Sequence, residues 1–118
     1  MKDFRDLKVW EKSHNVALNV YRLTKHFPKE EMYGLVSQMR RSNSSIPTNI
    51  AEGCGRGSDL QFGYFLNIAL GSASELKYQI ILSTDLGYLS VESSKKILTD
   101  LIEVKKMLAK LYSTVVRN

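Results

Sequence analysis

The segment GCGRGSDLQ at residues 53–61 decides how the chain is divided, because it contains both a helix stop and a helix start. Glycine commonly follows the last turn of a helix, so the run of glycines at 53–57 indicates a turn between two helices. Ser58, followed three residues later by Gln61, has the pattern of a capping box that opens a new helix. The segment therefore predicts one helix that ends at about Glu52 and another that begins after Ser58.

Outward from this turn, apolar residues recur with helical periodicity in four long stretches, separated by the chain's two prolines and seven glycines. The predicted helices cover residues 7–25, a stretch entered through a turn at 26–31 and ending near 52, residues 58–86, and residues 90–116. Gly87 supplies the stop of the third helix and Ser90 the cap of the fourth. Pro47 lies inside the second helix, where a missing hydrogen bond bends or splits a helix, and we expect a bend.

Short connections between long consecutive helices favour antiparallel neighbours, so the sequence predicts an all-α fold, an antiparallel up-and-down four-helix bundle. A length of 118 residues suits one domain spanning residues 1–118. A three-helix domain with a loose arm is the alternative. No stretch alternates apolar and polar residues long enough to predict a sheet.

The composition limits the classes of function. A formal net charge of +5 and a sequence pI near 9.4 favour an anionic partner. The charged N-terminus, residues 1–6, is unlike a signal peptide, and no apolar run has the roughly 18 residues of a membrane span, so we expect a cytoplasmic protein with no membrane partner. One cysteine, Cys54, and two histidines, His14 and His26, are too few for a zinc site, and no cofactor is expected.

Apolar residues of the third predicted helix spread around more of its circumference than one core requires. They are Leu60, Phe62, Tyr64, Phe65, Leu66, Ile68, Ala69 and Leu70. The fourth helix has a similar arc, from Met107 and Leu111 round to Ile102, with Lys105 in its middle. Such surface is costly in a monomer, so we predict a homo-oligomer, although helix ends and an inexact helical wheel can exaggerate the arc.

The second predicted helix carries a polar line opposite its core stripe, formed by Gln38, Arg41, Ser45, Asn49 and Glu52. In one interpretation the line is hydrogen-bonded or solvated, and Arg41 and Glu52 find ionic partners, including Glu75 of the third helix. In the other, Arg40, Arg41 and Arg56 lie near one another at one surface and bind phosphates, because planar guanidinium groups match phosphate oxygens. These three arginines are the candidate nucleic-acid-binding residues.

Several of these motifs carry a resemblance to a known family. They are Phe4–Trp10, Tyr33–Leu35, Gln38–Arg41, Ser45–Gly53, Gly55–Arg56 and Ala69–Leu76, and the run SIPTNIAEG at 45–53 is the most specific. The chain resembles the four-helix bundle proteins encoded by intervening sequences in bacterial 23S rRNA genes. It departs from them at residues 42–45, Ser-Asn-Ser-Ser, where relatives are richer in alanine and where helix propensity is therefore lower.

The resemblance implies a ring-shaped homopentamer. It also implies similarity to the accessory protein of diversity-generating retroelements, which partners a reverse transcriptase and binds nucleic acid. The expected function is non-enzymatic binding of structured RNA through charge and shape. The alternative is an assembly or adaptor protein that binds another protein and has no nucleic-acid role.

The residues argue against an enzyme. The glycines at 53–57 lack the Lys-Ser/Thr ending and preceding strand of a phosphate-binding loop. A nucleophile pair would need Cys54 beside His14 or His26, and an ion pair with nearby arginines explains Glu52 without catalysis. Trp10 and the aromatic residues of the third helix are expected in the core rather than against bases. The lysines of the fourth helix, Lys95, Lys96, Lys106 and Lys110, alternate with acidic residues and are expected mainly to be solvated, with a weak possible role toward RNA.

Overall fold

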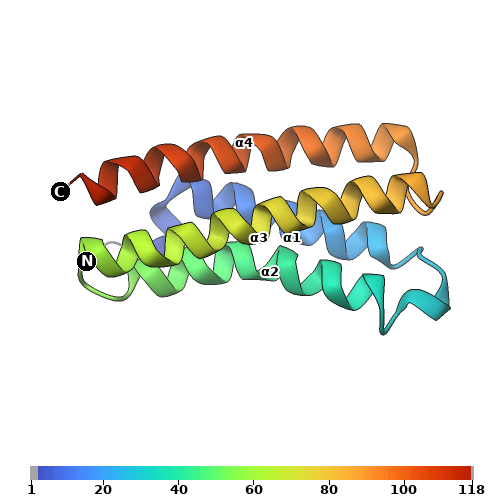
Figure 1. The fold of residues 1–118 in the computed structure, drawn as a ribbon, viewed down its shortest axis with the longest axis horizontal. Helices are drawn as coiled ribbons and strands as arrows, with labels where there is room; N and C mark the ends of the chain where they lie inside the picture. Colours follow the sequence, from blue (N-terminus) through green and yellow to red (C-terminus); the bar gives the residue numbers. More distant parts are fainter. Residues whose placement is uncertain (1–2, 118) are drawn as a thin grey trace.

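The computed structural model describes residues 3–117; Met1, Lys2 and Asn118 lie outside the described part. Its long elements are the helices α1 (Lys8–Thr24), α2 (Leu35–Cys54), α3 (Asp59–Asp85) and α4 (Val91–Val116). Each helix packs on two neighbours: α1 and α3 both lie against α2 and α4 (Figure 1). Successive helices run in opposite directions along a bundle 45 Å long, so the predicted antiparallel four-helix bundle is confirmed.

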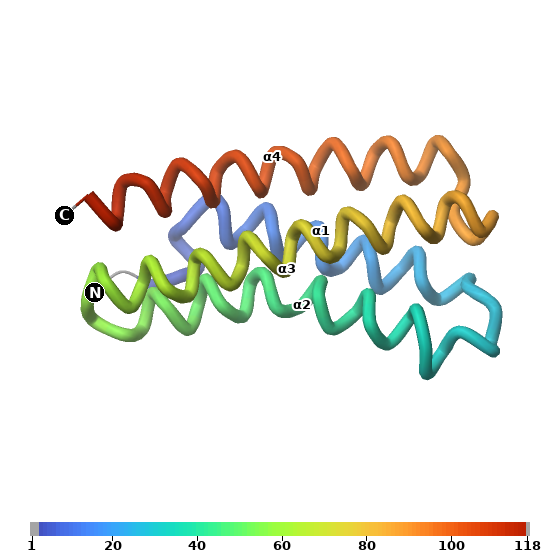
Figure 2. The backbone as a smooth tube through the Cα atoms, viewed as in Figure 1, coloured from blue at the N-terminus to red at the C-terminus, as the bar shows by residue number. Residues whose placement is uncertain are grey.

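The three connections lie at alternating ends of the bundle, as the backbone tube shows (Figure 2). The α2–α3 and α3–α4 connections are tight turns that place Gly57 and Gly87 at φ of +86° and +83°. These angles lie in the left-handed region, which glycine adopts without steric cost. The side chains of Ser58 and Ser90 accept hydrogen bonds from the backbone N–H groups of Gln61 and Ser93, at 3.2 and 3.0 Å. The predicted starts of α3 and α4 are therefore confirmed.

The start of the second helix was predicted wrongly. Residues 29–31 form a separate short 3-10 helix, and α2 begins only at Leu35. The interruption is at Gly34, whose φ of −112° and ψ of −107° do not belong to a helix. The Glu31 carboxylate accepts a hydrogen bond from the Leu35 N–H at 3.3 Å, so it satisfies one of the donors exposed at the start of α2.

Gly53 belongs to α2 rather than to the turn, because the helix continues to Cys54. A Cβ atom on Gly53 would lie 2.8 Å from the Cβ of Phe65 and 3.0 Å from a ring carbon of Phe62. Gly63 on α3 has the same role against α4, where its Cβ would lie 2.9 Å from Val116. Both glycines allow neighbouring helices to approach closely, so their role is in helix packing and not in ending a helix.

The Ser-Asn-Ser-Ser segment, which departs from the family pattern, ties α2 to two other helices. Ser42 donates a hydrogen bond to the side chain of Gln79 on α3 at 2.6 Å, and Asn43 donates to the carbonyl of Ala17 on α1 at 3.0 Å. All these groups are buried. The helix passes through this segment and through Pro47 without a break, so the split that was one predicted outcome at Pro47 does not occur.

Candidate nucleic-acid interface

Arg40 of α2 forms contacts with residues of α1. Its Nε donates to the Thr24 hydroxyl at 3.0 Å, and its terminal amino group donates to the Tyr21 carbonyl at 3.4 Å. The guanidinium also lies over the Tyr21 ring, 4.6 Å from the centroid. Thr24 is the last residue of α1, so this cation stabilises the negative end of that helix. These contacts leave Arg40 as a positioning residue within the bundle.

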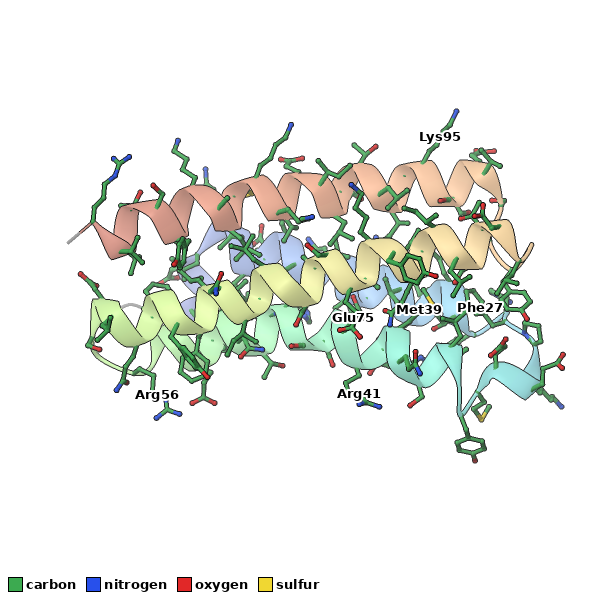
Figure 3. All side chains as sticks on the ribbon, viewed as in Figure 1. Phe27, Met39, Arg41, Arg56, Glu75 and Lys95 are labelled. Atoms are coloured by element: carbon green, nitrogen blue, oxygen red, sulfur yellow. The ribbon has the colours of Figure 1, made fainter. Side chains whose placement is uncertain are left out.

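Arg41 and Arg56 are exposed, but they lie at different places along the bundle. Thirteen helical residues separate Arg41 from the end of α2 at Cys54, which corresponds to about 20 Å, and Arg56 follows in the turn. Figure 3 shows both side chains on the side of the bundle away from α4. The structure therefore brings Arg40 and Arg41 together but does not place Arg56 beside them.

The polar line of α2 is largely satisfied by hydrogen bonds. The hydroxyls of Ser45 and Ser72 are 2.8 Å apart, and the Asn49 amide donates to the Ser45 carbonyl at 2.8 Å. Glu52 forms an ion pair with Arg56 at 3.2 Å. The predicted pairing of Arg41 with Glu75 is absent: within residues 3–117 the Arg41 side chain has neither an ion-pair nor a hydrogen-bond partner.

The structure reveals a basic stripe on α4 that the sequence reasoning undervalued. Lys95, Lys106, Lys110 and Arg117 fall within about 60° of one another around the helix axis, at 100° per residue. They extend over 22 residues, or about 33 Å along the helix. We call these four residues the α4 basic stripe. Their spacing of 11, 4 and 7 residues places all four on one face of a helix, so the stripe could have been recognised from the sequence.

No acidic residue within residues 3–117 forms an ion pair with the α4 basic stripe. Two acidic residues, Glu92 and Glu103, lie on or beside the same face. Glu103 is bound by Lys12 of α1 at 3.0 Å, and Glu92 is three residues before Lys95. The stripe therefore presents an excess of positive charge along one long helix, and its residue Lys95 lies on the side of the bundle opposite Arg41 and Arg56 (Figure 3).

The aromatic side chains are divided between the core and the surface. Trp10 is half-buried and packs against the core, with its ring parallel to His14 at 4.9 Å and in edge contact with Phe4 at 5.0 Å. Phe62 also packs against the core. Tyr64 is 65% exposed, so the expectation that the aromatic residues of α3 are core residues is wrong at this position.

The structure also bears on metal binding and membranes. Within the described residues no group of three or more His, Cys, Asp or Glu side chains lies close enough to hold a metal ion. None of the helices in that part of the chain combines the length and apolar character needed to cross a membrane.

Comparisons with known proteins agree with this architecture. The family model of the 23S rRNA-intervening sequence protein matches residues 5–110. A crystal structure of a protein from Bacteroides thetaiotaomicron is similar to the chain, with a TM-score of 0.83 and 31% sequence identity. The similarity covers 89% of this chain and 95% of that one, which is described as a protein with unknown function from the S23 ribosomal protein family. No curated protein matches the sequence.

Proposed function

The chain belongs to the family of 23S rRNA-intervening sequence proteins, and on this basis we propose that it is a non-enzymatic, self-associating protein that binds structured RNA through exposed basic side chains. Neither the family description nor that of the structural neighbour names a catalytic activity. The proposal includes a homopentameric assembly, which the resemblance to the 23S rRNA-intervening sequence family implies, and a location in the cytoplasm. The nucleic-acid partner follows from the expected similarity to the accessory protein of diversity-generating retroelements and from the basic charge of the chain.

The observation that carries the RNA proposal is the α4 basic stripe. Four cations without acidic partners, spread over about 33 Å of one helix, match an extended polyanion better than they match a small ligand. A smooth helix surface cannot enter the narrow major groove of an RNA duplex, so the contacts are with phosphates and sugars. Recognition therefore depends on charge and on the shape of the folded RNA rather than on base sequence.

Arg41 and Arg56 supply a second, smaller contribution in this proposal. Arg41 is exposed and has an uncommitted guanidinium, which suits a bidentate contact with a phosphate. The Arg56 guanidinium forms an ion pair with Glu52 at 3.2 Å and lies over the Phe65 ring, 5.1 Å from its centroid. A phosphate therefore has to compete with both contacts. We assign to Arg40 no direct contact with RNA, because its Nε and one terminal amino group donate hydrogen bonds within the bundle and its guanidinium lies over the Tyr21 ring.

The test is a fluorescence-anisotropy titration of a labelled RNA hairpin at low salt with three variants, the first two of which are matched in net charge. The first variant removes the α4 basic stripe by changing Lys95, Lys106, Lys110 and Arg117 to alanine. The control removes the same number of exposed positive charges elsewhere, at Lys8, Arg22, Lys25 and Lys29. The third changes Arg41 and Arg56 to alanine.

We expect the stripe variant to lose affinity by roughly tenfold or more, because released counterions provide most of such binding. The control variant should lose clearly less, since it has the same net charge but an intact stripe. Equal losses in the two variants would show that binding follows net charge and not the stripe. A wild-type protein that does not bind RNA, and that holds a protein partner with little dependence on salt, would favour the adaptor alternative.

A further inference from the structure

A hollow lies between the end of α1 and the start of α2. Its volume of about 390 Å³ is near the lower end of the range of about 300–1,000 Å³ for sites that bind small molecules. Its lining combines aromatic, apolar, hydroxyl and guanidinium groups, and it includes Tyr21, Met32, Tyr33, Ser37, Arg40 and Arg41. We call it the Tyr33 hollow.

Tyr33 is displayed to solvent at the edge of this hollow. Its side chain is 93% exposed, the largest fraction among the large hydrophobic residues in the described part of the chain, and Met32 beside it is 53% exposed. Both residues lie in the turn between the 3-10 helix at 29–31 and α2, where Gly34 departs from helical conformation. A ring with so little surface removed from water adds almost nothing to the core, and its faces are open to a ligand.

Arg41 supplies an unpaired positive charge in the same hollow. It follows Ser37 by four residues, or about one turn of α2, so the two side chains lie on one face of the helix. Within residues 3–117 its guanidinium has no ion-pair or hydrogen-bond partner. Arg40, in contrast, donates to the Thr24 hydroxyl at 3.0 Å. Arg41 is therefore the cation in the hollow that is available to an anion.

No carboxylate among the described residues lines the Tyr33 hollow. Glu31 is two residues from Tyr33, but its carboxylate accepts hydrogen bonds from the Leu35 N–H at 3.3 Å and from the Tyr88 hydroxyl at 3.0 Å. Glu30 is exposed and is not part of the lining. The hollow therefore favours an anionic ligand, and its aromatic and thioether surface is more than a phosphate alone would use.

The combination of ring, guanidinium and hydroxyl matches the parts of a nucleotide. A flat base packs on a tyrosine ring, a guanidinium binds a phosphate with two parallel hydrogen bonds, and the exposed Ser37 hydroxyl suits a ribose hydroxyl. A base inside a duplex is stacked on its neighbours and presents only its edges, so its face is not free to pack on Tyr33. The ligand that fits is therefore unpaired.

We propose that the Tyr33 hollow binds one unpaired nucleotide of a single-stranded RNA segment, with its base on Tyr33 and a phosphate on Arg41. The inference deepens the proposed RNA binding and rests on it, because it assigns single-stranded RNA to a second site. Arg41 and Lys95 lie on opposite sides of the bundle (Figure 3), so a duplex along the α4 basic stripe leaves the hollow accessible. Stacking tolerates every base, so the site should have little sequence preference.

The experiment compares two labelled RNAs, a short single strand of uridines and a blunt-ended duplex, in anisotropy titrations over a series of salt concentrations. Tyr33→Ala removes the ring, Tyr33→Phe keeps it, and Arg41→Ala removes the charge. The matched controls are Tyr64→Ala, which removes a 65% exposed tyrosine of α3, and Arg22→Ala, which removes an exposed guanidinium of α1 outside the hollow. Circular dichroism and light scattering verify the fold and the mass of each variant.

We expect Tyr33→Ala to lower the affinity for the single strand by roughly tenfold, the effect of one stacked base, and Tyr33→Phe to retain that affinity. Because tyrosine is uncharged, Tyr33→Ala should leave the salt dependence unchanged. Arg41→Ala should make the slope shallower by about 0.7, the value for one phosphate of a single strand. The Tyr64→Ala and Arg22→Ala controls should have slopes close to that of the wild type, and duplex binding should not depend on Tyr33.

Single-strand affinity that is unaffected by Tyr33→Ala, or that falls equally in Tyr33→Phe, would overturn the stacking of a base on this ring. An equal loss for the duplex would also overturn it, since the ring would then not select unpaired bases. A change in the mass of the Tyr33→Ala assembly would assign the ring to a contact between copies and would likewise overturn the proposal. A wild type that binds only the duplex would overturn the hollow alone, whereas a wild type that binds neither RNA would refute the proposed RNA binding itself.

Discussion

The same substitution, glycine to alanine, should have opposite effects at two positions inside the helices. Gly53 and Gly71 both lie within helices, so alanine gains helix propensity at both, by about 0.5–1 kcal/mol. At Gly71 the new methyl group enters open space, and nothing offsets this gain. The Gly71→Ala monomer should therefore be more stable than its parent.

At Gly53 the methyl group would lie 2.8 Å from the Cβ of Phe65 and 3.3 Å from the backbone oxygen of Phe62. Neither neighbour is the free end of a flexible side chain, so α2 and α3 must move apart. Overpacking of this kind costs about 1–3 kcal/mol, which exceeds the propensity gain. The free energy of unfolding should thus differ between the two alanine variants by about 1–3 kcal/mol.

This difference is measured by urea unfolding followed by circular dichroism. It equals the difference between the midpoint urea concentrations of the two variants multiplied by the common slope of free energy against urea concentration. Both alanine variants are measured in the wild-type background at one low protein concentration, so that self-association contributes as little as possible to the difference. For a chain of 118 residues, 1 kcal/mol corresponds to a shift of about 4 °C in the melting temperature. A Gly53→Ala protein as stable as Gly71→Ala would refute the close approach of α2 and α3 at that glycine.

Three further outcomes follow from the hydrogen bonds of the bundle. Arg40→Ala should lower the free energy of unfolding by about 1 kcal/mol, measured in urea, and leave RNA affinity unchanged, since its donors serve α1. Ser42→Ala should cost about 1–3 kcal/mol, because the buried oxygen of Gln79 loses its donor, and a thermal melt close to that of the wild type would exclude this. The hydrogen bond from Tyr88 to the Glu31 carboxylate, at 3.0 Å, raises the pKa of Tyr88 above its ordinary value of 10.0. The stabilisation from this bond is therefore present at neutral pH and lost as the pH rises through that pKa, and Glu31→Gln should lower the pKa in an ultraviolet absorbance titration.

The sequence was sufficient where a local signal determines the structure. Ser58 and Ser90 cap their helices as predicted, since an N-cap depends only on the next three residues. Gly53 was assigned to a turn, although the structure places it inside α2. Glycine is required there because Phe62 and Phe65 of another helix approach it closely, and such a contact between helices cannot be recognised from the neighbouring residues in the sequence. The late start of α2 was missed because it depends on the backbone conformation at Gly34, which the sequence does not specify.

The candidate site was predictable only in part, for a similar reason. Arg40 and Arg41 are adjacent in sequence, but only the fold shows that the first is bonded to α1 while the second points to solvent. Arg56 was grouped with them without allowance for the length of α2. The α4 basic stripe was missed because its lysines alternate in sequence with Glu92, Asp100 and Glu103 and were expected to be mainly solvated, whereas the structure pairs Glu103 with Lys12 of α1.

The central claim, binding of structured RNA by the α4 basic stripe, is tested most directly by the salt dependence of the affinity. A plot of the logarithm of the binding constant against that of the salt concentration has a slope of about −0.9 per phosphate neutralised. The account predicts that removing Lys95, Lys106, Lys110 and Arg117 makes this slope shallower by about 3 to 4, whereas the charge-matched control has a slope close to that of the wild type. Identical slopes for the stripe variant and the wild type would contradict it.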